Sequence, residues 1–125
     1  MKKLSLLCAL LASSLYIGVA YAQEAPVKKD GDILVSETGM TLYTFVKDAA
    51  GSGKSACNGA CAGLWPPLTA SATAKDSGDY TVITREDGSR QWAFKGKPLY
   101  MYASDKKAGD RTGDNFKDNW HVIKN

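Results

Sequence analysis

The sequence contains few of the residues that carry most enzymatic and metal chemistry. Its 125 residues include one histidine, His121, and three cysteines, and no serine lies in a G-x-S-x-G nucleophile elbow. No C-x-x-C pair stands in a thioredoxin-like βαβ pattern, and no glycine-rich phosphate loop follows an expected strand. With no catalytic set and no metal or cofactor signature, we expect a non-enzymatic protein that needs no cofactor.

The sequence also lacks a strong excess of charge. It has 16 lysines and arginines against 13 acidic residues, a formal net charge of +3. Two of these lysines, Lys2 and Lys3, belong to the leader segment described next, and without them the counts are 14 and 13, a net charge of +1. No basic stripe runs along any segment, so nucleic acid is not an expected partner.

Residues 1–22 have the features of an export signal. Lys2 and Lys3 precede a mostly apolar stretch, and Ala20-Tyr21-Ala22 fits an A-x-A cleavage site. We therefore expect cleavage near Gln23, no stable membrane anchor afterwards, and a periplasmic or secreted product. Cys8 lies too early, inside the apolar stretch, to carry a lipid at the cleavage site.

One pattern, G-x-x-L-Y-x-aromatic-x-x-D, occurs twice, at residues 39–48 and 96–105. Alternate side chains of a strand share a face, so the two aromatic residues of each copy should point the same way. A carboxylate at the end of such a strand can accept hydrogen bonds from loop N–H groups. The repeat residues are Tyr43, Phe45 and Asp48 in the first copy, and Tyr100, Tyr102 and Asp105 in the second.

The rest of the chain predicts a mainly β fold. After a flexible lead-in at residues 23–31, residues 32–125 should form a single β-rich domain, whose repeats cover about 33–68 and 90–123. The two repeats should pack as pseudo-symmetric halves of a small antiparallel sheet, sandwich or barrel. Expected strands, rich in β-branched and aromatic residues, lie at 33–35, 40–46, 80–85, 90–94, 99–103 and 119–123. One or two helical turns should lie within 55–64, before Trp65-Pro66-Pro67.

Cys57 and Cys61 are the cysteines that remain after the leader. Their C-x-x-x-C spacing places the thiols within disulfide reach, and disulfides persist in exported proteins. We expect a disulfide that shapes the loop before Trp65. The alternative is a copper or thiol-redox site that uses the two thiols and His121, because thiolates suit Cu(I).

Two further groups of residues have a structural and a functional interpretation. Most of the aromatic residues should form the core, but Trp65 and Trp120 lie beside loops and are, with His121, the candidates to face a ligand. The loop that follows the second motif is rich in oxygen ligands, but its spacing does not match an EF-hand, and we expect a solvated, turn-rich loop. Its polar residues are Asp105, Asp110, Asp114, Asn115 and Asp118.

Three sequence features together resemble a known family. The doubled Y-x-aromatic-x-x-D motif, the segment Cys57–Pro67 and the segment Asp87–Trp92 occur in the order typical of the bacterial secreted repeat of unknown function. Members of that family are often described as predicted lipoproteins. The resemblance implies no activity, and we expect an exported binding or structural module for an unknown envelope component or small ligand. A weaker alternative is an inhibitor of an envelope hydrolase.

Overall fold

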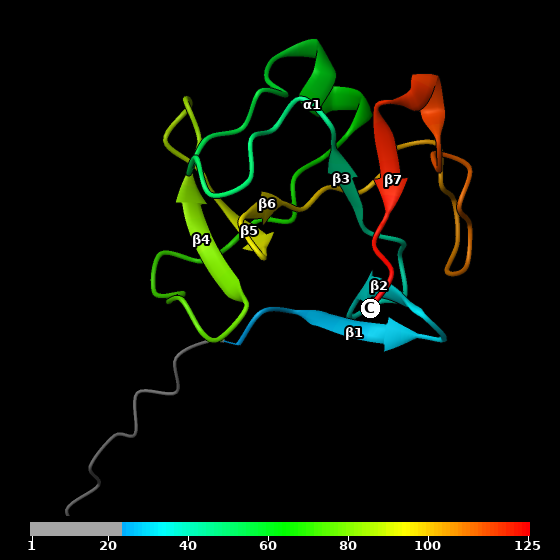
Figure 1. Ribbon diagram of the computed structural model, residues 1–125, viewed down its shortest axis with the longest axis horizontal. Coiled ribbons are helices and arrows are strands. Elements are labelled where there is room, and N and C mark those ends of the chain that lie inside the picture. Colours follow the sequence, from blue (N-terminus) through cyan, green and yellow to red (C-terminus); the bar gives the residue numbers. More distant parts are fainter. Residues whose placement is uncertain (1–23) are drawn as a thin grey trace, which may run out of the picture.

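The computed structural model describes residues 24–125, and the expected leader lies outside the described residues. The described chain is mainly β, as predicted, with three small antiparallel sheets and an α-helix of five residues (Figure 1). None of its helices is long and apolar enough to span a bilayer. The elements are β1 (Val27–Asp30), β2 (Ile33–Ser36), β3 (Tyr43–Phe45), α1 (Ala60–Leu64), β4 (Tyr80–Thr84), β5 (Arg90–Phe94), β6 (Lys97–Pro98), the 3₁₀ turn η1 (Phe116–Asp118) and β7 (Trp120–Val122).

The first sheet pairs β1 with β2 and corrects one expectation. The flexible lead-in predicted at residues 23–31 is wrong for β1, whose four residues pair in register with those of β2. Val27 is partly buried and the other β1 residues are exposed, whereas all of β2 is buried. An exposed strand has no apolar alternation for a sequence pattern to detect. Backbone hydrogen bonds to a buried neighbour hold β1 in place.

The second sheet joins the two repeats. β3 belongs to the first motif and pairs with β7 near the end of the chain, with Tyr43 opposite Val122 and Phe45 opposite Trp120. β3 is shorter than the strand expected at 40–46, and β7 lies within the strand expected at 119–123. This sheet places the first motif against the C-terminal part of the second repeat.

The third sheet is the predicted meander of β4, β5 and β6. Tyr80 pairs with Phe94 and Thr84 with Arg90 across β4 and β5. The strand expected at 99–103 does not form, because the backbone there has different partners at successive residues. Leu99 N–H donates to the Trp92 carbonyl, while Tyr100 exchanges hydrogen bonds of 2.8 and 3.0 Å with Tyr43.

Two hydrophobic clusters form the interior. The first is largely aliphatic, with Trp92 and Phe94 among leucines from both repeats. The second contains Tyr43, Phe45, Cys57, Trp65, Tyr100 and Trp120. α1, at the top of Figure 1, packs against this second cluster through Cys61. None of the residues of α1 is buried. The repeat motifs therefore build the aromatic part of the core.

Candidate functional site: crossed tyrosine–aspartate pairs

The two copies of the motif are joined by hydrogen bonds that cross between the repeats. Tyr43 Oη donates to Asp105 Oδ2 at 2.6 Å, and Tyr100 Oη donates to Asp48 Oδ2 at 2.6 Å. All four side chains are buried. Hydrogen bonds to a charged acceptor are stronger than neutral ones, and a buried carboxylate left without donors costs free energy. Each repeat therefore supplies the partner that the other repeat needs.

Each aspartate also fastens the loop that follows it, as the sequence predicted. Asp48 Oδ1 accepts the Ala56 N–H at 2.6 Å. Asp105 Oδ1 accepts the Thr112 N–H at 3.0 Å and the Thr112 hydroxyl. One carboxylate oxygen thus binds a loop of its own repeat, and the other binds a tyrosine of the opposite repeat. The sequence pattern showed the local contact and gave no sign of the distant one.

Both tyrosines of the crossed pairs are held in the protonated form. Burial raises the pKa of Tyr43 above its ordinary range, and the hydrogen bond to Asp105 raises it further. Burial likewise raises the pKa of Tyr100, followed by the hydrogen bond to Asp48. The phenols therefore act as permanent hydrogen-bond donors at neutral pH and have little basic or nucleophilic character.

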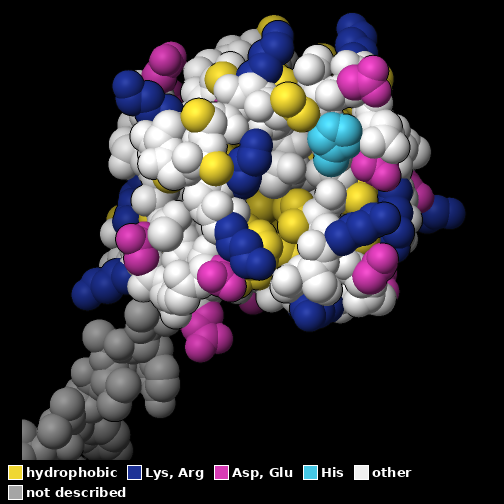
Figure 2. Space-filling model, viewed as in Figure 1, with side chains coloured by type: hydrophobic (Ala, Val, Ile, Leu, Met, Phe, Trp, Pro, Cys, Tyr) yellow, Lys and Arg dark blue, Asp and Glu magenta, His cyan; other side chains and the backbone are white. Residues whose placement is uncertain are grey.

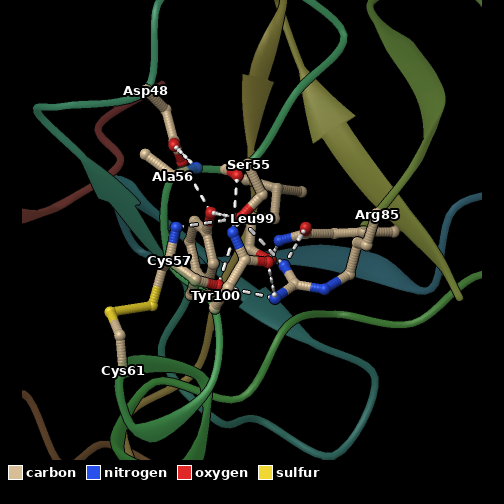
Figure 3. The surroundings of a disulfide bond; sticks show 10 residues. Asp48, Ser55, Ala56, Cys57, Cys61, Arg85, Leu99 and Tyr100 are labelled. Atoms are coloured by element: carbon tan, nitrogen blue, oxygen red, sulfur yellow. Dashed lines mark hydrogen bonds between the residues drawn. A yellow bond between two sulfur atoms is a disulfide. The ribbon is translucent and has the colours of Figure 1, made fainter. Parts of the chain in front are cut away.

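The Tyr100–Asp48 pair is extended by a buried guanidinium. Figure 3 shows Arg85 reaching from the end of β4 towards Ser55, whose hydroxyl lies 2.6 Å from Tyr100 Oη. Arg85 is 5% exposed and makes hydrogen bonds to four uncharged acceptors. These acceptors are Ser55 Oγ at 3.0 Å, Gln91 Oε1 at 2.7 Å, the Cys57 carbonyl at 2.6 Å and Asn58 Oδ1 at 3.3 Å. The sequence analysis missed Arg85, which precedes Glu86-Asp87-Gly88 and resembles an exposed hairpin residue.

The exposure expected for Trp65 and Trp120 is wrong. Trp65 is 3% exposed and Trp120 4%, and their rings stack at 3.9 Å between centroids with planes 3° apart. They come from equivalent positions of the two repeats, so packing the repeats together buries both. His121, the third candidate to face a ligand, is partly exposed on β7, and its Nδ1 lies 3.0 Å from Asn115 Oδ1.

The family comparison agrees with this two-repeat arrangement. The family described as a secreted repeat of unknown function matches residues 26–69 and residues 81–124. Each match contains one tyrosine and one aspartate of the crossed pairs. The chain belongs to this secreted-repeat family. No curated protein and no solved structure matches the chain. Family membership therefore gives this chain an exported character and a repeat boundary, and it assigns no activity.

In this secreted-repeat protein the predicted disulfide joins Cys57 to Cys61. Cys57 is fully buried in the aromatic cluster and Cys61 is partly exposed on α1. With both sulfur atoms paired, the site presents no thiolate for Cu(I) in this oxidised form. Within residues 24–125, no group of three or more histidine, cysteine or acidic side chains is placed to hold a metal ion.

The acidic loop of the second repeat uses its carboxylates to cap backbone groups. Asp110 Oδ2 accepts the N–H groups of Lys106 and Lys107 at 2.8 and 3.1 Å. Asp114 Oδ1 accepts the Val122 N–H at 3.0 Å, which ties the loop to β7. These contacts are those of a turn-rich loop, the interpretation that the sequence favoured over a calcium site.

A pocket of about 600 Å³ lies away from the crossed pairs, against the aliphatic cluster. Its lining consists of Glu24, Pro26, Glu37, Thr69, Ala70, Ser71 and Trp92. The sequence analysis missed this site, because its residues come from four separate segments of the chain. Its two carboxylates fit the recognition of a positively charged group, and the nearly buried Trp92, 2% exposed, forms part of the lining.

Proposed function

We propose that this chain is an exported, non-enzymatic module of the periplasm or secreted medium, and that it binds a cationic ligand in the pocket beside Trp92. Its membership of a secreted family supports the exported character. The pocket supports the binding role, since its volume of about 600 Å³ lies in the usual range for small-ligand sites. A polyamine or a lysine-containing segment of an envelope protein has the charge and size for this site.

The observation that carries the proposal is the combination of two acidic side chains with a fixed wall. Glu24 and Glu37 line the pocket. Arg90 donates to the Ser71 carbonyl at 2.6 Å and to the Ala74 carbonyl at 2.9 Å, which holds the wall that contains Thr69 and Ala70. A wall fixed before binding reduces the ordering cost of binding.

The face of the molecule viewed in Figure 1 carries charges of both signs. Figure 2 shows acidic and basic side chains interspersed over this face. An acidic pocket on a surface of mixed charge attracts cations locally and is screened by salt at distances beyond about 10 Å. Binding should therefore weaken as ionic strength rises.

The proposal is tested by titrating the purified protein with spermidine and with trilysine. Calorimetry should detect binding, and the indole N–H resonance of Trp92 should shift while those of Trp65 and Trp120 remain unchanged. Glu37→Gln should weaken binding about fivefold, because it removes one charge contact of about 1 kcal/mol. Glu86→Gln, in the exposed β4–β5 turn, is the matched control and should leave binding unchanged. Lack of binding by both cations, or equal affinities in the two variants, would contradict the proposal.

A further inference from the structure

Four aromatic rings form a continuous column through the second cluster. Phe45 stacks on Trp120 at 4.3 Å, Trp120 on Trp65 at 3.9 Å, and Trp65 on Tyr102 at 4.1 Å. The angles between successive planes are 12°, 3° and 19°, so the rings lie nearly parallel. Aromatic pairs in protein cores adopt edge-to-face as well as offset-stacked arrangements, so packing alone does not require three successive stacked pairs. A column of this length places the π systems of four side chains in contact from end to end.

The two tyrosines of the crossed pairs meet this column edge-on. The Tyr43 ring lies 5.3 Å from Trp65 at 80°, and the Tyr100 ring lies 5.1 Å from Trp120 at 89°. A path of ring contacts therefore runs from Tyr100 through Trp120 and Trp65 to Tyr43. Both ends of the path are phenols, and each phenol donates a hydrogen bond of 2.6 Å to a buried carboxylate.

This combination has a specific consequence for one-electron chemistry. A buried phenol beside a carboxylate holds its proton while its ring is neutral. When the ring loses an electron, the phenol becomes a strong acid, and a carboxylate at hydrogen-bond distance receives the proton without any movement of the chain. The neutral radical that results carries no charge into the buried site, which avoids the large cost of an isolated charge there.

We propose that the aromatic column relays single oxidising equivalents from ring to ring. Each equivalent ends as a tyrosyl radical in one of the crossed tyrosine–aspartate pairs. At the partly exposed Tyr102 end of the column, an oxygen-centred radical takes one electron from the Trp65–Trp120 pair through the Tyr102 ring and becomes the corresponding anion, which water protonates. The tryptophan radical cation then takes an electron from Tyr43 while the Tyr43 proton moves to Asp105 Oδ2. The products are neutral tryptophan, a neutral tyrosyl radical and a protonated Asp105. This second step leaves the net charge of the site unchanged, and the loss of the electron in the first step raises it by one. The same balance holds for Tyr100 and Asp48.

Tyr102 gives the relay its contact with the surface. It ends the column, is partly exposed, and its ring lies 5.8 Å from that of Phe116, which is 38% exposed. The relay therefore reaches the solvent at one end while its resting positions are buried. The site contrasts with the aliphatic cluster, where Trp92 lies among leucine, isoleucine and alanine side chains.

The test uses photogenerated tris(bipyridine)ruthenium(III) as the one-electron oxidant and transient absorption as the readout. In the unaltered protein, the tryptophan radical should decay as the tyrosyl radical appears. The double variant Tyr43→Phe/Tyr100→Phe should lengthen the lifetime of the tryptophan radical about tenfold. A tenfold slower decay corresponds to an activation free energy higher by about 1.4 kcal/mol. Tyr80→Phe, in β4 outside the column, should leave the lifetime unchanged.

Two further measurements separate the relay from an ordinary aromatic core. Asp105→Asn combined with Asp48→Asn keeps a hydrogen-bond acceptor but removes the proton acceptor, and it should lower the yield of tyrosyl radical. The unaltered protein in deuterated solvent should form that radical more slowly, and this result does not depend on any variant folding. Equal lifetimes in the tyrosine variants and the control, or no solvent isotope effect in the unaltered protein, would overturn the proposal.

Discussion

The loops that follow the two motif aspartates are both held in place by the core of the domain, but by different interactions. The first loop, residues 49–59, is joined to α1 by the Cys57–Cys61 disulfide and anchored by Arg85. The second loop, residues 106–119, has its aspartate bonded to Thr112 and its backbone drawn against the aromatic column. At Gly113 an added Cβ would lie 2.6 Å from the Trp65 ring, so only glycine permits that approach.

The two loops also differ in how they accommodate left-handed backbone. In the first loop every residue with a positive φ is a glycine, namely Gly51, Gly53 and Gly59. In the second loop, non-glycine residues occupy such positions, with φ of 62° at Asn115, 50° at Lys117 and 57° at Asp118. Side chains in this region cost about 1–2 kcal/mol each, less for asparagine and aspartate. The disulfide and the buried Arg85 therefore secure the first loop. The second loop contains strained backbone, and packing against the aromatic rings must hold it.

The strongest way to break this comparison is Arg85→Met. This change should lower the free energy of unfolding by about 4 kcal/mol, because the buried Gln91 Oε1 is left without its donor and the Ser55 hydroxyl and the Cys57 carbonyl each lose one donor. Urea denaturation followed by circular dichroism measures the loss. Arg111→Met, at an exposed position of the second loop, should change stability little. A loss below 1 kcal/mol in Arg85→Met would show that the first loop does not depend on the guanidinium.

Alkaline pH tests whether the two pairs respond alike despite their different loops. The pKa of Tyr43 and of Tyr100 is raised in the folded state above the ordinary value near 10, so their contribution is complete below pH 10 and declines above it. At pH 11 the raised pKa of each tyrosine should lower the free energy of unfolding by about 1.4 kcal/mol relative to neutral pH, and the two together should lower it by about 3 kcal/mol. Urea midpoints measured from pH 8 to pH 11 report the decline, and replacing one tyrosine by phenylalanine should remove half of it. An undiminished slope in that variant would assign the decline to other groups.

Conservative replacement of each tyrosine sharpens the difference between the pairs. Tyr100→Phe should lower the free energy of unfolding by about 2.5 kcal/mol, because Asp48 then retains a single N–H donor and the Ser55 hydroxyl loses its shortest hydrogen bond. Tyr43→Phe should cost about 1.5 kcal/mol, because Asp105 retains both donors of Thr112. Urea denaturation of the two variants, with Tyr80→Phe as the control, gives the ranking. The reverse ranking would contradict the assigned roles of the two loops.

Reduction of the disulfide tests the covalent half of the comparison. Opening so short a ring should lower the free energy of unfolding by about 2 kcal/mol in the chain-entropy account. Hydrogen exchange should become faster at residues 55–61 and stay unchanged at residues 106–112. Equal acceleration in both loops would show that the disulfide stabilises the whole domain and not its own loop.

The smallest expected effect lies in the second loop. Lys117→Gly relieves a left-handed backbone position and should raise the free energy of unfolding by about 0.5 kcal/mol after the entropy of the added glycine is subtracted. Lys107→Gly, at an exposed turn position of the same loop, should lower it by a similar amount. Thermal denaturation of both variants measures the difference, and a decrease in both would mean that Lys117 carries no strain.

Local spacing in the sequence predicted the features that depend on neighbouring residues. The alternation of Tyr43 with Phe45, the Cys57–Cys61 disulfide and the bonds from each aspartate to its own loop all involve residues a few positions apart. The features that sequence reasoning missed depend on distant residues. Arg85 is buried because a loop from the first repeat covers it, and Trp65 is buried because Trp120 stacks on it. Neither partner is visible in the local pattern.

The crossed hydrogen bonds make residues of one repeat depend on residues of the other. Tyr43 and Asp105 are 62 positions apart, and Tyr100 and Asp48 are 52 positions apart. A substitution at Tyr43 should therefore be compensated by a change at Asp105 and should be indifferent to the aspartate of its own motif. In alignments of two-repeat relatives, covariation should follow this diagonal, so the unit on which selection acts is half of one copy together with half of the other.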